Sequence, residues 1–188
     1  QVVDPQNRGT LIPCKPKSEA AADDECARIF IGGYGRLLYR RALQPGEVST
    51  RVKLAREAAN TTKDFYAGLS AVLSDMLISP NFLFRYRTVE PDPAKPGENR
   101  LDGYSKAAAL SYFLWNATPD DQLLKAAEKG ELHTKAGLQR QVDRMIGAPS
   151  VEGGIRAFFA DMLRFSDFET VAKDTTFFPR YTAKISEL

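Results

Sequence analysis

"LSYFLWNATPDDQLLKAAEKGEL", residues 110–132, joins a run of aromatic and leucine side chains to an abrupt Thr-Pro-Asp-Asp step. The run contains Trp115, which is the only tryptophan of the chain. Thr118 is a residue type that caps helices, Pro119 suits the first helical position, and acidic side chains are favoured in the first turn. The stretch therefore predicts the buried end of one helix followed by the start of the next.

Helical spacing of apolar residues extends over most of the 188-residue chain. We expect helices to begin at or near Ser18, Pro45, Thr62, Asp102, Thr118, Thr134 and Ser150, and a last helix near Tyr181. No segment shows sustained alternation with a period of two, which is typical of half-buried strands. The sequence therefore predicts an all-α protein.

Residues 89–99, "VEPDPAKPGEN", hold three prolines and a glycine among charged residues, and this composition is typical of a linker. We expect two packed helical sub-bundles joined by this Pro-rich linker. The first unit would cover residues 18–88 after an extended arm at 1–17. The second would cover residues 100–188 and be incomplete at its C-terminal end.

Composition limits the possible partners. A hydrophobic fraction of 43% and a charged fraction of 27% are normal for a soluble globular protein. The 26 basic and 24 acidic residues leave a net charge of only +2, which is too small a field to indicate nucleic-acid binding. No apolar run is long enough for a transmembrane segment, so none is expected.

Cys14 and Cys26 are the two cysteines of the chain, and they flank a predicted helix start. They are either a free pair of thiols or a disulfide that ties the extended arm to the first helix. Their spacing suits the disulfide, which would imply an oxidising compartment. We therefore expect a periplasmic or extracellular protein.

Residue types that carry catalysis or bind metals are sparse. His133 is the only histidine and lies in a predicted inter-helix turn, where a surface role is the simpler reading. One histidine and two cysteines cannot supply the usual ligand set of a zinc site, and the chain has no Cys-x-x-Cys-His for covalent haem attachment. The glycine-rich "IGGYGRL", residues 31–37, predicts either close packing of another helix or a local weakening of the helix at Gly32 and Gly35, rather than phosphate binding. No catalytic, cofactor-binding or metal-binding residue is assigned.

Several stretches, in this order, resemble two adjoining helical domains of unknown function in the secreted, planctomycete-type cytochrome-c-domain proteins. They are "YRRALQPGEV" (39–48), "FYAGLSAVLSDMLISPNFLFRYR" (65–87), "LDGYSKAAALSYFLWNATPDDQLLKAAEKGEL" (101–132), "LQRQVDRMIGAPSVEGGIRAFFADMLRFSDFE" (138–169) and "FFPRY" (177–181). The resemblance implies an exported protein. It also implies that a c-type haem would reside in a linked domain or a partner, because the haem motif is absent from this chain.

The expected function is a non-catalytic scaffold or docking module of a larger exported, cytochrome-associated redox protein. Its partners would be other domains of the same polypeptide or a redox protein, and Trp115, Tyr112 and Phe82 are candidate interface residues. Enzymatic activity of this chain alone is not expected. Asn60 and Asn116 match the N-glycosylation sequon.

Two alternative functions remain open from the sequence. The chain could form part of an extracellular oxidoreductase or hydrolase whose active site other domains complete. Asp120, Asp121, Arg85 and Tyr104 would then meet around a cleft between the two units, although adjacent aspartates on a helix point about 100° apart and suit helix-capping roles better. The other alternative is a structural subunit of an electron-transfer complex.

Overall fold

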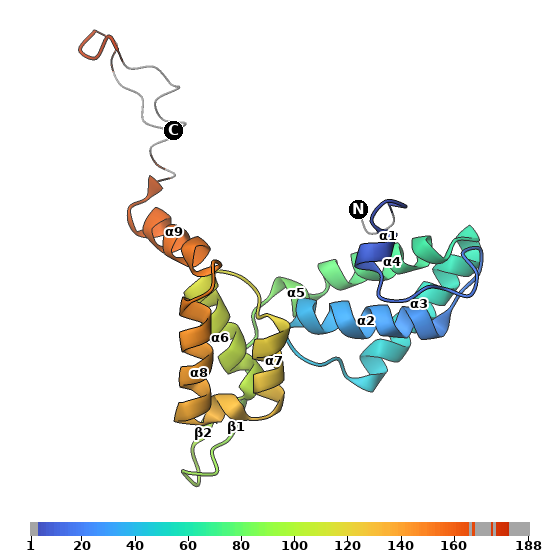
Figure 1. Ribbon diagram of the computed structural model, residues 1–188, viewed down its shortest axis with the longest axis horizontal. Coiled ribbons are helices and arrows are strands. Elements are labelled where there is room, and N and C mark those ends of the chain that lie inside the picture. Colours follow the sequence, from blue (N-terminus) through green and yellow to red (C-terminus); the bar gives the residue numbers. More distant parts are fainter. Residues whose placement is uncertain (1–3, 166, 168–173, 175, 181–188) are drawn as a thin grey trace.

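The computed structural model describes residues 4–165, 167, 174 and 176–180, and this part is all-α apart from one short β-ribbon, which confirms the predicted fold class. The elements are α1 (Arg8–Leu11), α2 (Asp24–Tyr39), α3 (Pro45–Thr62), α4 (Phe65–Ile78), α5 (Pro80–Leu83), β1 (Val89–Pro91), β2 (Asn99–Leu101), α6 (Gly103–Trp115), α7 (Asp121–Glu128), the 3-10 turn η1 (Glu131–His133), α8 (Lys135–Ile146) and α9 (Val151–Met162). Figure 1 shows α2, α3 and α4 grouped on one side of α5, and α6 to α9 on the other. The predicted last helix near Tyr181 falls outside the described residues.

The first helical group packs α2, α3 and α4 around one apolar core. Its largest fully buried side chains are Phe30, Ile31, Phe65, Leu69, Val72 and Met76. Gly35 lies at a close helix contact, because a Cβ there would stand 2.7 Å from the side chains of Leu43 and Met76. Gly32, for which close packing was one of the two predicted roles, has nothing within 4 Å of such a Cβ and is not at a contact.

The predicted starts of α2 and α4 are each displaced along the chain. Ser18 does not cap α2, because Asp23 accepts hydrogen bonds from the backbone N–H groups of Glu25 and Cys26 at 3.1 and 3.0 Å. Thr62 is the last residue of α3, and α4 begins at Phe65 after Asp64, which caps it. An aspartate with two backbone donors in reach thus sets each start.

The predicted disulfide between Cys14 and Cys26 is confirmed, with the two Cα atoms 5.5 Å apart. It fastens the N-terminal arm to the first turn of α2. Ile12 of the arm is buried in the first core, and the Tyr34 hydroxyl donates a hydrogen bond to the Leu11 carbonyl. The arm is therefore part of the packed structure of the first group.

The second helical group surrounds Trp115 at the end of α6. The indole is 8% exposed and its Nε1–H donates to the Met145 carbonyl of α8 at 2.9 Å. Leu123, Leu132 and Met145 complete this core from α7, η1 and α8. Helix α9 then packs across α6 at Gly154, where a Cβ would collide with the Leu114 carbonyl, so the contact requires glycine.

The Thr-Pro-Asp-Asp step caps α7 differently from the prediction. Asp120, not Thr118, is the N-cap, and its carboxylate accepts from the Leu123 N–H at 2.8 Å. Pro119 precedes the cap and is fully buried. The carboxylate of Asp120 also binds Arg144 of α8 at 2.6 Å, a tertiary contact that favours it over Thr118 as the cap.

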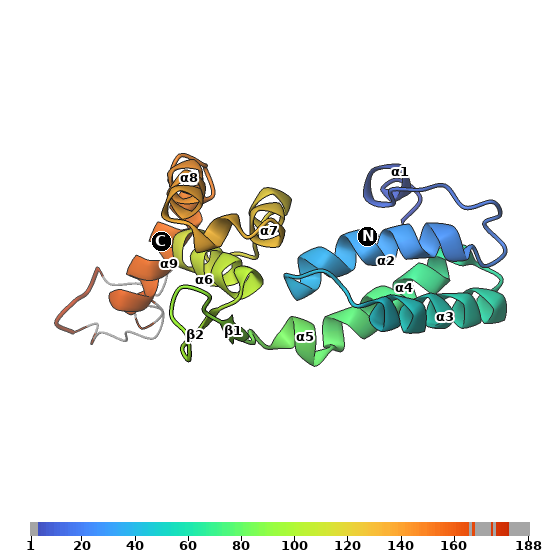
Figure 2. The ribbon, with the colours of Figure 1, turned by 90° about the horizontal axis from the view of Figure 1, so that it is seen from below.

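The segment expected to be a linker contains the β-ribbon. β1 and β2 pair antiparallel with Val89 opposite Leu101 and Pro91 opposite Asn99. Strands of three residues are too short to show a period-two pattern, so the sequence did not reveal them. Figure 2 shows the ribbon between α5 and α6, where the chain passes from the first helical group to the second.

None of the helices found between residues 4 and 165 has both the length and the apolar character needed to cross a bilayer.

Candidate functional site

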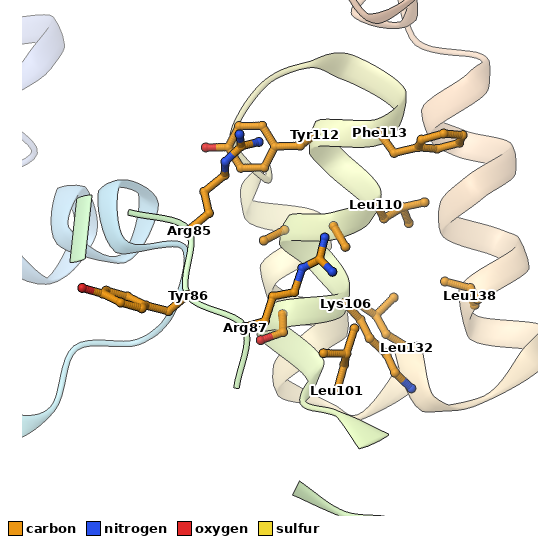
Figure 3. A pocket seen from close by; sticks show the side chains of 13 residues that line it. Arg85, Tyr86, Arg87, Leu101, Lys106, Leu110, Tyr112, Phe113, Leu132 and Leu138 are labelled. Atoms are coloured by element: carbon orange, nitrogen blue, oxygen red, sulfur yellow. The ribbon is translucent and has the colours of Figure 1, made fainter. Parts of the chain in front are cut away.

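Residues 84–88, "FRYRT", form a strap that runs from α5 to β1 alongside α6. Alternate side chains of an extended segment point to opposite sides. Arg85 and Arg87 point toward α6, whereas Tyr86 between them points away, as Figure 3 shows. The strap therefore turns two guanidinium groups toward one face of α6.

That face of α6 carries small side chains in its middle. Asp102 caps the helix by accepting from the Ser105 N–H at 2.6 Å, and the following Ala107, Ala108 and Ala109 are strong helix formers. The small side chains of Ser105, Ala108 and Ala109 form the floor of an open cavity beside the strap. The cavity has a volume of about 840 Å³. We call this space the cationic groove, because Arg85, Arg87 and Lys106 line it together with apolar residues from α6, η1 and α8.

The strap is fastened at both ends. At its start, the buried guanidinium of Arg40 donates through Nη2 to the carbonyls of Asn81 and Phe84, at 2.6 and 2.9 Å. At its end, the Thr88 N–H donates to the Ser105 hydroxyl at 2.9 Å, and the Asp102 N–H donates to the Thr88 carbonyl at 3.1 Å. The cationic side of the groove is thus held in place by backbone contacts.

Two cations of the groove, Arg85 and Lys106, have defined neighbours. The Arg85 guanidinium lies 4.5 Å from the centre of the Tyr112 ring, in cation–π geometry. Lys106 Nζ lies 3.0 Å from His133 Nδ1, and His133 Nε2 lies 3.3 Å from a Glu90 carboxylate oxygen. Burial, together with the charges of Lys106 and Arg100, lowers the pKa of His133 below its usual value, so the neutral imidazole is favoured.

Asp121 and Tyr104, two of the four cleft candidates, lie at the junction between the helical groups. Arg36 of α2 binds Asp121 and also donates from Nε to Glu128 at 2.8 Å. The Tyr104 hydroxyl donates to the same Glu128 at 3.3 Å. Its hydrogen bond with Arg36 lowers the pKa of Glu128, and burial raises the pKa of Tyr104, so the junction holds one ionised acid and one neutral phenol.

The other two candidates are elsewhere. Asp120 caps α7 and binds Arg144, whose guanidinium lies 5.5 Å from the centre of the Trp115 ring. Arg85 lies in the cationic groove. The structure thus brings Asp121 and Tyr104 to one junction and leaves Asp120 and Arg85 apart from it.

The three candidate interface residues have different surroundings. Trp115 is in the second core, and Phe82 is half-buried against the first. Tyr112 is half-buried and lines the cationic groove beside Phe113, which is 81% exposed. Of the three, only Tyr112 faces an open site.

Helix α9 presents apolar side chains to solvent. Ile155, Phe158, Phe159 and Met162 are 52%, 61%, 45% and 54% exposed. The helix itself is held against α6 through the buried Gly154. We call these four residues the α9 face.

Metal-binding and glycosylation sites were also sought among the described residues. In the residues that the structure describes, no three His, Cys, Asp or Glu side chains are grouped so that they could hold a metal ion. Asn60 and Asn116, the two sequon residues, are both exposed, and Asn116 has the left-handed conformation that ends α6.

Comparison with known families gives two matches that follow one another along the chain. Residues 26–86 match PSD5, described as a protein of unknown function (DUF1595), and residues 101–188 match PSD4, described as a protein of unknown function (DUF1592). The chain contains two adjoining domains, DUF1595 and DUF1592. They are typical of planctomycete cytochrome-c-associated proteins. No curated protein and no solved structure matches the chain.

Both descriptions leave the activity open, so the residues at these sites carry the functional argument. The DUF1595 match covers α2 to α5 and reaches into the strap, and the DUF1592 match begins at the end of the β-ribbon. The cationic groove therefore lies where the two domains meet.

Arg36, Arg40 and Arg87 contribute to these sites, but no sequence motif marks them as site residues. Arg36 and Arg40 have no partner near them in the sequence, because Glu128 lies 92 residues from Arg36, and Asn81 and Phe84 lie 41 and 44 residues from Arg40. A local signal did exist for Arg87, because Arg85 and Arg87 alternate with Phe84 and Tyr86. That alternation is too short to distinguish from chance without the structure.

Proposed function

We propose that this chain is a non-catalytic helical docking module of a larger, exported protein associated with a c-type cytochrome. The observation that carries the proposal is the α9 face. Four large apolar side chains exposed together on one helix are typical of a surface that another protein surface covers. The occupant is a haem-bearing domain of the same polypeptide or a redox partner, because DUF1595 and DUF1592 are typical of cytochrome-associated proteins.

Export is supported by the Cys14–Cys26 disulfide. Disulfides persist in oxidising compartments and are rare where glutathione keeps thiols reduced. A periplasmic or extracellular location is the one that both the disulfide and the proposed association with a c-type cytochrome favour.

A scaffold role is supported by how the acidic side chains are used. Asp120 caps α7 and holds Arg144, while Asp121 and Glu128 hold Arg36 across the domain junction. These contacts stabilise the arrangement of helices. The pairs of Arg36 with Asp121 and Glu128 hold the two domains together, and a docking module needs such a fixed arrangement.

The redox part of the proposal is tested on the protein isolated from its native cells. We expect a Soret band to accompany the purified protein. If the purified protein contains no haem, and no haem protein is attached to it before or after chemical cross-linking, the proposed association with a cytochrome is wrong.

The docking part is tested by amide hydrogen exchange. We expect residues 155–162 to exchange more slowly in the native protein than in the isolated chain, because a partner covers the α9 face. Helix α3, which packs in the first core and lies outside the α9 face, serves as an internal control and should exchange equally in both. Equal exchange of α9 in the two samples would show that this face is not a docking surface.

A further inference from the structure

The cationic groove has two chemically different walls. Arg85 and Arg87 form one wall on the strap, and Lys106 stands at one end of the floor. The opposite wall is apolar, with Phe113 of α6 pointing toward α8 and Leu138 of α8 pointing toward α6. A ligand that fills the groove would meet positive charge along one side and hydrocarbon along the other.

The groove contains no acidic side chain among its lining residues. In the part of the chain that the structure describes, neither Arg85 nor Arg87 forms an ion pair, and the nearest polar neighbour of Lys106 is His133. Most other arginines do have carboxylate partners, namely Arg8, Arg36, Arg41, Arg51, Arg56, Arg100, Arg140, Arg144, Arg156 and Arg164. Three cations without a carboxylate partner among the described residues, Arg85, Arg87 and Lys106, therefore line one groove.

The dimensions of the groove suit a short chain segment. Its floor runs along α6 from Ser105 to Phe113, which at about 1.5 Å per residue is roughly 12 Å. That length accommodates about two turns of a helix or about four residues of extended chain. The strap wall is already held in place at Arg40 and Thr88, so little ordering of the protein is needed when a ligand binds.

We propose that the cationic groove binds an acidic, amphipathic peptide segment of a partner protein. Carboxylates of the segment pair with Arg85 and Arg87, whose planar guanidinium groups match carboxylate geometry, and its apolar side chains pack on Phe113 and Leu138. An acidic polysaccharide fits less well, because the apolar wall of Phe113 and Leu138 offers no hydrogen bonds to sugar hydroxyls. This site is separate from the α9 face and does not depend on the proposed cytochrome association.

The test uses a short synthetic peptide labelled with a fluorophore, with glutamates along one helical face and leucines along the other. Binding to the whole chain is followed by fluorescence anisotropy. We expect saturable binding that weakens with added salt, since the Arg side chains of the groove are exposed. A peptide with lysines in place of the glutamates should not bind, and one with serines in place of the leucines should bind at least several-fold more weakly.

Matched variants locate the binding site. Arg85→Gln/Arg87→Gln should weaken binding about tenfold, the effect of losing two exposed charge pairs. Arg28→Gln/Lys129→Gln removes the same charge from exposed positions outside the groove and should change affinity less than twofold. Leu138→Ser tests the apolar wall and should weaken binding several-fold. Circular dichroism of each variant confirms that it is folded.

Three results would overturn the proposal. The first is equal weakening by the two double variants, which would mean that net charge alone attracts the peptide. The second is equal binding of the lysine and glutamate peptides. The third is tighter binding of an oligogalacturonate than of the peptide, which would identify the groove as a site for acidic sugars.

Discussion

Arg36 of α2 and Glu128 of α7 form an ion pair across the junction of the DUF1595 and DUF1592 domains, with Nε 2.8 Å from Oε1. The Arg36 side chain is only 17% exposed, and it binds Asp121 as well. One arginine thus holds two acids of α7. Its hydrogen bond with Glu128 raises the pKa of Arg36, so the charge is present at every accessible pH.

Arg36→Met should therefore destabilise the protein and loosen the junction. We expect the free energy of unfolding to fall by about 1 kcal/mol, because both acids are partly exposed and are hydrated again when the arginine is removed. Urea unfolding measures it, and we expect the transition to broaden as the two domains unfold less cooperatively. Arg156→Met, which removes an exposed pair with Glu152 on α9, is the control and should cost less than about 0.5 kcal/mol. Indistinguishable unfolding curves for the two variants would show that Arg36 does not couple the domains.

Arg40 should be more costly to replace than Arg36. It is buried, has a left-handed backbone conformation at φ 58°, and its guanidinium binds the carbonyls of Asn81, Phe82 and Phe84. Arg40→Met leaves these carbonyls without their donor, and we expect a loss of about 2–4 kcal/mol. Arg40→Lys keeps the charge but not the planar set of donors, so its unfolding midpoint should lie between those of wild type and Arg40→Met. A loss below about 0.5 kcal/mol for Arg40→Met would mean that the strap does not depend on this contact.

Glu47 should make stability depend on acid pH. Arg41 binds its two oxygens at 2.8 and 2.9 Å, and these hydrogen bonds, with one from the Gln44 N–H, lower the pKa of Glu47 from 4.5 to about 2. The unfolded chain takes up this proton more readily than the folded one. The stabilisation is therefore complete above pH 4.5 and is lost as the pH falls toward 2, by at most about 3 kcal/mol.

Urea unfolding across this pH range tests the Glu47 prediction. Glu47→Gln should be less stable than wild type at neutral pH and should show a smaller loss of stability on acidification. Glu57→Gln, which removes an exposed carboxylate paired with Lys53, should keep the wild-type profile. The prediction is wrong if the Glu47→Gln and wild-type profiles stay parallel down to pH 2.

Local chemistry explains which parts of the fold were predictable from the sequence. Pro45 begins α3, Asp102 caps α6 and Thr134 caps α8, all as predicted. Each of these signals acts within about four residues of its own position. They needed no knowledge of the tertiary structure.

Two of the wrong predictions involve competing caps whose choice depends on tertiary contacts. Asp23 replaces Ser18 as the cap of α2, and it also accepts from the Lys17 N–H of the arm at 3.0 Å. Asp120 replaces Thr118, and it binds Arg144 in another helix. Neither contact can be read from helix propensity or capping preference alone.

The sites were harder to predict than the fold for the same reason. The cationic groove combines a strap, one face of α6 and the start of α8. In each of these segments the side chains form no recognisable sequence motif. The alternation of aromatic residues and arginines in "FRYRT" gains its significance only because α6 presents alanines to it. Packing therefore creates the site from residues that carry no motif.

His133 should report directly on the charges beside the cationic groove. Burial is the main cause of its lowered pKa, followed by the charges of Lys106 and Arg100, while Glu90 acts in the opposite direction. Because the folded pKa lies below the ordinary value of 6.5, the unfolded chain binds the proton more readily. The stability from neutral His133 is complete above pH 6.5 and declines as the pH falls below it.

Since His133 is the only histidine of the chain, its ring protons give an unambiguous NMR titration. Lys106→Gln should raise its pKa, because the variant removes a cation whose Nζ lies 3.0 Å from Nδ1. Glu90→Gln should lower the pKa further, because it removes the carboxylate 3.3 Å from Nε2. Opposite shifts from two substitutions on either side of one ring separate these charge effects from a general loss of structure, which would bring both pKa values toward 6.5. Shifts of the same sign in both variants would contradict this geometry.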